Sequence, residues 1–66
     1  MERTKLKIKR VEKRLTQKQV AEAIGVTVPM YSLIENGKRK GSIEQWDKIR
    51  EIFNMTYEEA WNLMLG

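Results

Sequence analysis

Apolar residues recur at intervals of three and four along most of this chain, which is the spacing of amphipathic helices. No segment shows the sustained alternation of apolar and polar residues that a β-strand requires. We therefore predict an all-α fold that forms one domain over residues 1–66, as a compact bundle of five helices. The predicted helices span about residues 4–13, 17–24, 28–35, 43–53 and 57–64.

Each predicted helix has one face that we expect to pack inward, because residues three and four apart lie on the same side of a helix. Met64 and Leu65 lie so near the end of the sequence that a partner surface is plausible for them. The residues expected to face inward are Leu6, Arg10 and Val11, then Val20, Ala23 and Ile24, then Tyr31, Ile34 and Glu35, then Trp46, Ile49, Ile52 and Phe53, and finally Trp61.

Residues 15–39 contain the most specific pattern, two short helices joined by a tight turn. Thr16 followed by Gln19 has the spacing of a capping box at a helix start. Gly25 stands where a helix end needs a residue with positive φ. Thr27 can cap the next helix, and Pro29 falls in its first turn, where a missing N–H costs little. This layout is typical of a helix-turn-helix.

On these residues the chain resembles the phage repressor and Cro-type helix-turn-helix domains. The resemblance covers roughly residues 5–63, and the combination of these motifs at these spacings is specific. The matching motifs are Leu15-Thr16-Gln17, Val20-Ala21, Ile24-Gly25-Val26-Thr27 and Ile34-Glu35-Asn36-Gly37-Lys38-Arg39, followed by Ser42-Ile43-Glu44, Lys48-Ile49, Asn54-Met55-Thr56 and Glu58-Glu59.

The resemblance implies a sequence-specific regulator of transcription, most often a repressor, that binds double-stranded operator DNA. In such domains the third helix enters the major groove, and twofold dimers occupy two half-sites about one DNA turn apart. The resemblance is compatible with a homodimer on DNA through the C-terminal helix, where Met64 and Leu65 offer a partner surface. The sequence is equally compatible with a whole Cro-like protein and with the DNA-binding part of a longer repressor.

The charge distribution agrees with a polyanionic partner. Residues 1–40 contain 11 Lys and Arg against 4 Glu, whereas residues 41–66 contain 2 basic and 5 acidic residues. A basic front half suggests one face built for nucleic acid, although a solvated, lysine-rich surface would look the same by composition alone.

The positions that would face base edges depart from the family pattern. Where relatives place Gln, Arg, Asn or Lys, this chain has Val28, Pro29 and Leu33, with Ser32 as the one polar candidate. Apolar side chains can contact thymine C5-methyl groups, so recognition should depend on methyl contacts, phosphate contacts and DNA shape. The alternative is a protein-interaction module on the same scaffold, in which an exposed patch of proline, leucine and methionine side chains of the third helix binds a partner, for example as an antitoxin or anti-repressor type of binder.

The sequence retains two features of the family, the residues of a buried ion pair and a set of residues that contact phosphates. Glu35 falls on the inward face of the third helix, where an unpaired carboxylate would be costly. The family often pairs this glutamate with an arginine of the first helix, which implies a structural ion pair with Arg10; two unrelated surface charges are the alternative. The candidate phosphate contacts are Gln17, Lys18, Thr27, Asn36, Lys38, Arg39 and Lys40.

The chain contains no Cys and no His, which removes disulfides, thiolate metal ligands, and the commonest general base and zinc ligand. We find no glycine-rich phosphate loop and no metal-ligand cluster, and so predict no catalytic activity, cofactor, metal or small-molecule ligand. No apolar run is long enough to span a membrane, and no signal peptide is visible. The expected location is the cytoplasm, in association with the nucleoid.

Overall fold

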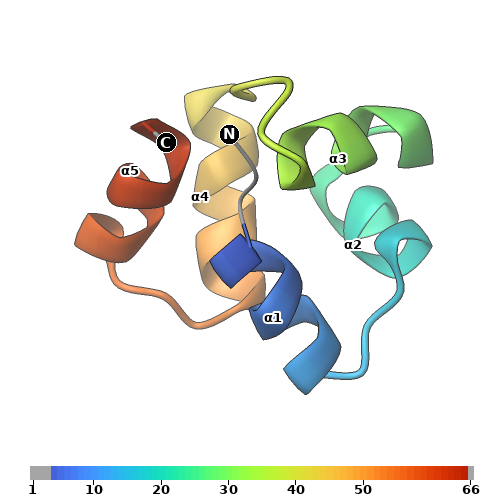
Figure 1. The fold of residues 1–66 in the computed structure, drawn as a ribbon, viewed down its shortest axis with the longest axis horizontal. Coiled ribbons are helices and arrows are strands. Elements are labelled where there is room, and N and C mark those ends of the chain that lie inside the picture. Colours follow the sequence, from blue (N-terminus) through green and yellow to red (C-terminus); the bar gives the residue numbers. More distant parts are fainter. Residues whose placement is uncertain (1–3, 66) are drawn as a thin grey trace.

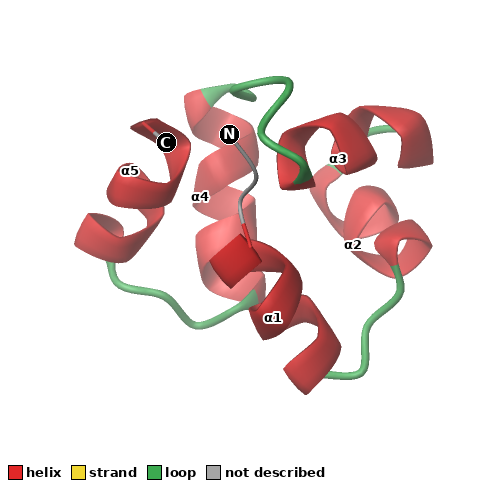
Figure 2. Ribbon diagram, in the orientation of Figure 1, coloured by secondary structure: helices red, strands yellow, loops and turns green. Residues whose placement is uncertain are grey.

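The computed structural model describes residues 4–65, and the regular structure in this range is entirely helical (Figures 1 and 2). The predicted all-α class is confirmed, and every helix begins and ends within one residue of its predicted position. The helices are α1 (Thr4–Glu12), α2 (Gln17–Ile24), α3 (Val28–Glu35), α4 (Ile43–Ile52) and α5 (Tyr57–Leu65).

Helix α4 lies in the middle of the fold, with α2 and α3 on one side of it and α5 on the other (Figure 1). It packs directly against α2 and α5, while α3 packs against α2 and α1. The helix-turn-helix pair α2–α3 and the C-terminal helix are therefore separated by α4. A surface on α3 and a surface on α5 can serve different partners.

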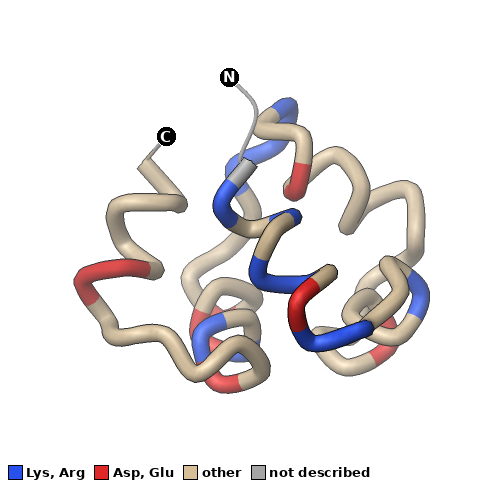
Figure 3. Tube along the Cα trace, turned by 60° about the horizontal axis from the view of Figure 1, so that its bottom comes forward, with Lys and Arg blue, Asp and Glu red and all other residues tan. Residues whose placement is uncertain are grey.

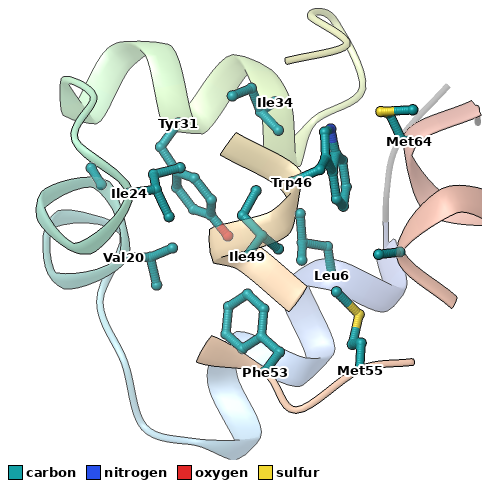
Figure 4. Packing of buried hydrophobic residues seen from close by; sticks show 12 residues of the cluster. Leu6, Val20, Ile24, Tyr31, Ile34, Trp46, Ile49, Phe53, Met55 and Met64 are labelled. Atoms are coloured by element: carbon teal, nitrogen blue, oxygen red, sulfur yellow. The ribbon is translucent and has the colours of Figure 1, made fainter. Parts of the chain in front are cut away.

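One cluster of buried side chains joins all five helices (Figure 4). Tyr31 and Ile34 of α3 and Ile49 of α4 lie at its centre and are fully buried. Such a cluster supplies most of the stabilisation of a domain this small, because helices of eight to ten residues are marginal on their own. Its members are Leu6, Val20, Ala21, Ile24, Tyr31, Ile34, Trp46, Ile49, Phe53, Met55, Ala60 and Met64.

Local capping sets the helix starts as the sequence indicates. The Thr16 hydroxyl accepts a hydrogen bond from the Gln19 backbone N–H at 3.1 Å, and the Gln19 side chain accepts one from the Thr16 N–H at 2.8 Å. The same reciprocal pair joins Ser42 with Gln45 at the start of α4 and Thr56 with Glu59 at the start of α5. Each box satisfies N–H groups that have no partner within the helix.

Two inward residues of the N-terminal half were predicted wrongly. Val11 is 56% exposed, because the buried side of α1 is set by Leu6 and Arg10, which are four residues apart, and Val11 lies about 100° further round. In α2 the small buried residue is Ala21 rather than Ala23. Both α3 and α4 pack against α2, which widens its buried face toward Ala21.

The C-terminal helix also differs from expectation. Trp61, predicted to close the core, is 53% exposed, while Met64, considered for a partner surface, is buried. Ala60 and Met64 are four residues apart and form the inward face of α5. Trp61 therefore lies outside that face, on a line with Tyr57 and Leu65, which are also exposed.

Candidate nucleic-acid interface

Helices α2 and α3 form a helix-turn-helix whose turn is built from local signals. Gly25 ends α2 with φ of 76°, and its N–H bonds back to the last turn of α2. This left-handed conformation suits glycine because a Cβ would be strained there. Thr27 then caps α3 by accepting a hydrogen bond from the Met30 N–H at 3.3 Å, and Pro29 lies in the first turn.

A buried ion pair attaches α3 to α1. The Arg10 Nε donates to Glu35 Oε2 at 3.0 Å, and its Nη2 donates to Oε1 at 3.2 Å, in a two-pronged arrangement. The Glu35 side chain is 2% exposed and that of Arg10 is 13% exposed. A bidentate, desolvated pair fixes geometry strongly, because removal of either partner leaves a buried charge without compensation.

The Arg10 and Glu35 side chains also contact residues at the start of α2. Arg10 Nη1 donates to the backbone oxygen of Leu15 at 2.8 Å, and the Gln17 amide nitrogen lies 3.4 Å from Glu35 Oε2. An amide nitrogen carries two hydrogens, so Gln17 can bond Glu35 with one and keep the other for a phosphate oxygen. The network therefore joins α1, the start of α2 and the end of α3 in one arrangement.

Tyr31 lies on the same inward face and points from α3 into the core (Figure 4). Its hydroxyl is buried and has no hydrogen-bond partner within the described part of the chain. Burial raises the pKa of Tyr31 well above its usual value, and the nearby Glu35 carboxylate raises it further. The phenol therefore stays neutral, since an ionised form would be desolvated beside a negative charge.

The loop after α3 is tied down at both ends. The backbone oxygen of Leu33 accepts hydrogen bonds from the N–H groups of Lys38 at 2.9 Å and Arg39 at 3.1 Å. At the other end, the Trp46 indole N–H donates to the backbone oxygen of Lys40. The three basic side chains are exposed, so the loop presents positive charge from a backbone that is fixed against α3 and α4.

Gly41 explains how this loop can lie so close to α4. Its φ is 82°, and a Cβ at this position would stand 3.1 Å from the Trp46 indole nitrogen and 3.3 Å from Ile34 Cδ1. A side chain would meet both a backbone strain and a packed neighbour.

A helix-turn-helix family model matches residues 6–59, which is most of the chain. The chain belongs to this helix-turn-helix family. The resemblance to phage repressor and Cro-type domains is thereby confirmed, and the family is one of DNA-binding regulators. No curated protein and no solved structure matches the chain.

In this helix-turn-helix, α3 presents a surface that we call the outward face of α3, formed by Val28, Pro29, Ser32 and Leu33. Val28 is 39% exposed and Pro29 is exposed, whereas Ser32 and Leu33 are half-buried. The Ser32 hydroxyl accepts a weak hydrogen bond from the Asn36 amide at 3.4 Å. Sequence reasoning had placed a methionine in this apolar patch.

That methionine, Met30, packs against the core instead. The remaining predicted contact residues lie at the two ends of α3, at the start of α2 and in the loop after α3. Thr27 and Asn36 are exposed at the two ends of α3, and Lys18 is exposed in the first turn of α2. Basic residues lie along α1 and in the loop after α3, whereas carboxylates lie at the start of α5 (Figure 3).

An apolar groove between α4 and α5 was missed by sequence reasoning. It has a volume of about 560 Å³ and is open to solvent, because Ile43, Tyr57 and Trp61 on its walls are 74%, 73% and 53% exposed. The Arg50 guanidinium lies 4.2 Å from the centre of the Tyr57 ring and 3.0 Å from Asp47 Oδ1, which fixes one wall. The spacing of four residues between Tyr57, Trp61 and Leu65 was the available signal.

Among residues 4–65, no group of three or more His, Cys, Asp or Glu is placed to hold a metal ion. Over the same range, none of the helices has the length and apolar character needed to cross a membrane.

Proposed function

We propose that this protein is a sequence-specific repressor that inserts α3 into the major groove of double-stranded DNA. The observation that carries the proposal is the position of the outward face of α3. The start of α2, where Gln17 contacts Glu35, lies beside the end of α3, and the basic loop that follows α3 is anchored to it by backbone hydrogen bonds. A helix flanked in this way can enter a groove while its neighbours contact the two phosphate ridges.

Phosphate contacts come from both edges of this surface. At the start of α2, Gln17 and Lys18 lie beside N–H groups that favour an anion. At the end of α3, Asn36 precedes the basic residues Lys38, Arg39 and Lys40. These groups supply affinity that is independent of sequence, because each contact releases condensed counterions from DNA. Thr27 completes the set at the start of α3.

Base recognition falls to the outward face of α3. Ser32 can bond either base type, and the three apolar residues can contact the methyl group of thymine. Binding across a promoter would exclude the transcription machinery, so repression is the expected outcome.

We further propose that a homodimer forms through α5 and the groove beside it. Tyr57, Trp61 and Leu65 form an exposed apolar stripe along α5, and Ile43 of α4 continues it across the groove. A twofold contact buries the same patch on both copies, and α4 separates this patch from α3. Both copies of α3 therefore stay available for DNA.

A second candidate is a protein-interaction module that uses the outward face of α3. The observation in its favour is that Val28, Pro29 and Leu33 provide none of the paired hydrogen-bonding groups that usually distinguish bases. An exposed apolar surface of this kind is also typical of protein partners.

Selection of bound sequences from a random duplex pool tests the proposal. We expect enrichment of a palindromic motif with half-sites about one DNA turn apart, which would support both base recognition and the dimer. Retention that disappears with added salt, without an enriched motif, would overturn the proposal in favour of the protein-interaction module.

A further inference from the structure

The outward face of α3 has few groups that could distinguish bases by hydrogen bonds. Val28 and Pro29 are exposed in its first turn, and Leu33 is half-exposed one turn later. The one side-chain hydroxyl on this face, Ser32, already accepts a hydrogen bond from Asn36. Carbon atoms therefore make up most of what this face offers to a major groove.

The major groove offers one apolar group to such a face. Each base edge there consists of nitrogen and oxygen donors and acceptors, apart from the C5-methyl group of thymine. Methylation of cytosine at C5 places the same methyl group at the same position of the pyrimidine ring. Thymine and 5-methylcytosine then differ at C4, which carries an O4 acceptor in thymine and an N4 donor in cytosine. An alkyl side chain forms a hydrogen bond with neither group, so it does not distinguish them.

We propose that the outward face of α3 recognises the C5-methyl group of pyrimidines, so that 5-methylcytosine in a C·G pair is bound much as thymine is. The inference rests on the proposed insertion of α3 into the major groove and names the class of site it selects. Methylation of cytosine in the operator then strengthens binding.

The structure also makes this face rigid enough to discriminate a single methyl group. Pro29 fixes φ in the first turn, and the branched Val28 has few rotamers in a helix. The Arg10–Glu35 pair and the hydrogen bonds that Leu33 accepts hold the last turn of α3. Burial of one methyl group contributes about fourfold in affinity when the receiving surface is already in place.

The experiment compares bases that differ only by the methyl group. In the site obtained by selection, each thymine is replaced in turn by uracil, and each contacted T·A pair is then replaced by C·G with cytosine or 5-methylcytosine. We expect thymine to bind about fourfold more tightly than uracil at one or more positions, and 5-methylcytosine to exceed cytosine by a similar factor at the same positions.

Polar substitutions on the outward face locate the methyl contact on the protein. Val28→Asn, Pro29→Ser and Leu33→Asn replace alkyl groups by polar ones, and at least one of them should abolish both methyl effects. Val11→Asn makes the same chemical change at a valine that is 56% exposed on α1, and it should retain both effects. Circular dichroism of each variant verifies folding.

The base substitutions test the proposal on the unmodified protein, so a poorly folded variant does not weaken it. An enriched motif with no difference between thymine and uracil, or between 5-methylcytosine and cytosine, would overturn the methyl proposal and leave DNA recognition standing. Absence of any enriched motif would overturn both together. Methyl effects that persist in Val28→Asn, Pro29→Ser and Leu33→Asn alike would assign the contact to another surface and overturn the role of this face.

Discussion

Each face of α3 carries residues that are unusual for its side of a surface helix. The buried face includes Glu35, which is 3% exposed, whereas the outward face carries Val28 and Pro29 in solvent. On the buried face the carboxylate is compensated by Arg10 and approached by Gln17, so its chemistry is fixed by partners inside the fold. On the outward face the exposed apolar side chains remain available to a partner.

This difference separates the residues that hold α3 from those that would select its ligand. Loss of a packed or paired group on the buried face lowers the free energy of unfolding and, through it, impairs everything the domain does. A change on the outward face should alter recognition and leave the fold largely intact. Four predictions test this separation, in order of decreasing expected effect.

Loss of the buried ion pair should have the largest effect. Arg10→Met leaves Glu35 buried without a counter-charge and removes the hydrogen bond to the Leu15 oxygen, so we expect a loss of about 3 kcal/mol in stability. The double variant Arg10→Met/Glu35→Leu should recover much of that loss, since neither charge remains. Urea unfolding measures both. An Arg10→Met variant as stable as the parent would show that the pair does not contribute.

Truncation on the outward face should affect binding more than folding. Leu33→Ala should weaken binding to the preferred site by about 1–2 kcal/mol, the range for removal of a single base interaction. Leu63→Ala is a matched control, because Leu63 is also half-buried but lies on α5. If Leu33→Ala lowers stability as much as Leu63→Ala does and leaves DNA affinity unchanged, Leu33 contributes to folding and not to base recognition, which contradicts the prediction.

The basic loop should act on all DNA sequences alike. Lys38→Ala or Arg39→Ala should weaken binding to specific and random duplexes equally and reduce the slope of log K against log salt by about one for each phosphate no longer neutralised. Lys48→Ala, at an exposed lysine of α4, serves as the control. A slope that stays at the parent value in both loop variants would remove this loop from the interface.

Removal of the Tyr31 hydroxyl should have the smallest effect at neutral pH. Because this buried group has no partner in the described part of the chain, Tyr31→Phe should leave stability unchanged or raise it by less than about 1 kcal/mol.

The same substitution should act at high pH. The folded-state pKa of Tyr31 is raised above the ordinary value of 10.0, so the unfolded chain loses this proton first and parent stability falls as pH rises past that value. Tyr31→Phe should remove this part of the alkaline loss. Equal alkaline slopes for parent and variant would show that the phenol is not buried as described.

Helix boundaries were predictable from sequence because capping is local. Thr16, Ser42 and Thr56 each stand three residues before Gln or Glu, and each pair forms the expected reciprocal hydrogen bonds. Gly25 adopts the positive φ expected of it for the same reason.

Which side of a helix is buried was predictable where the apolar pattern was strong and failed where it was ambiguous. Tyr31 and Ile34 face inward as expected, but Val11 and Trp61 do not, because burial there depends on which helices pack alongside. The loop that Trp46 and Gly41 hold against α4 depends on tertiary contacts that no local pattern contains. The assignment of residues to DNA contacts remains a prediction, since it depends on a partner outside the chain.

Chemical protection of the selected duplex tests the central claim most directly, namely that α3 occupies the major groove. Dimethyl sulfate methylates guanine N7 in the major groove and adenine N3 in the minor groove. We predict that the bound protein protects N7 in two patches about one DNA turn apart and leaves N3 reactive between them. Protection of N3 alone, or protection of neither atom at a site the protein demonstrably occupies, would contradict the account.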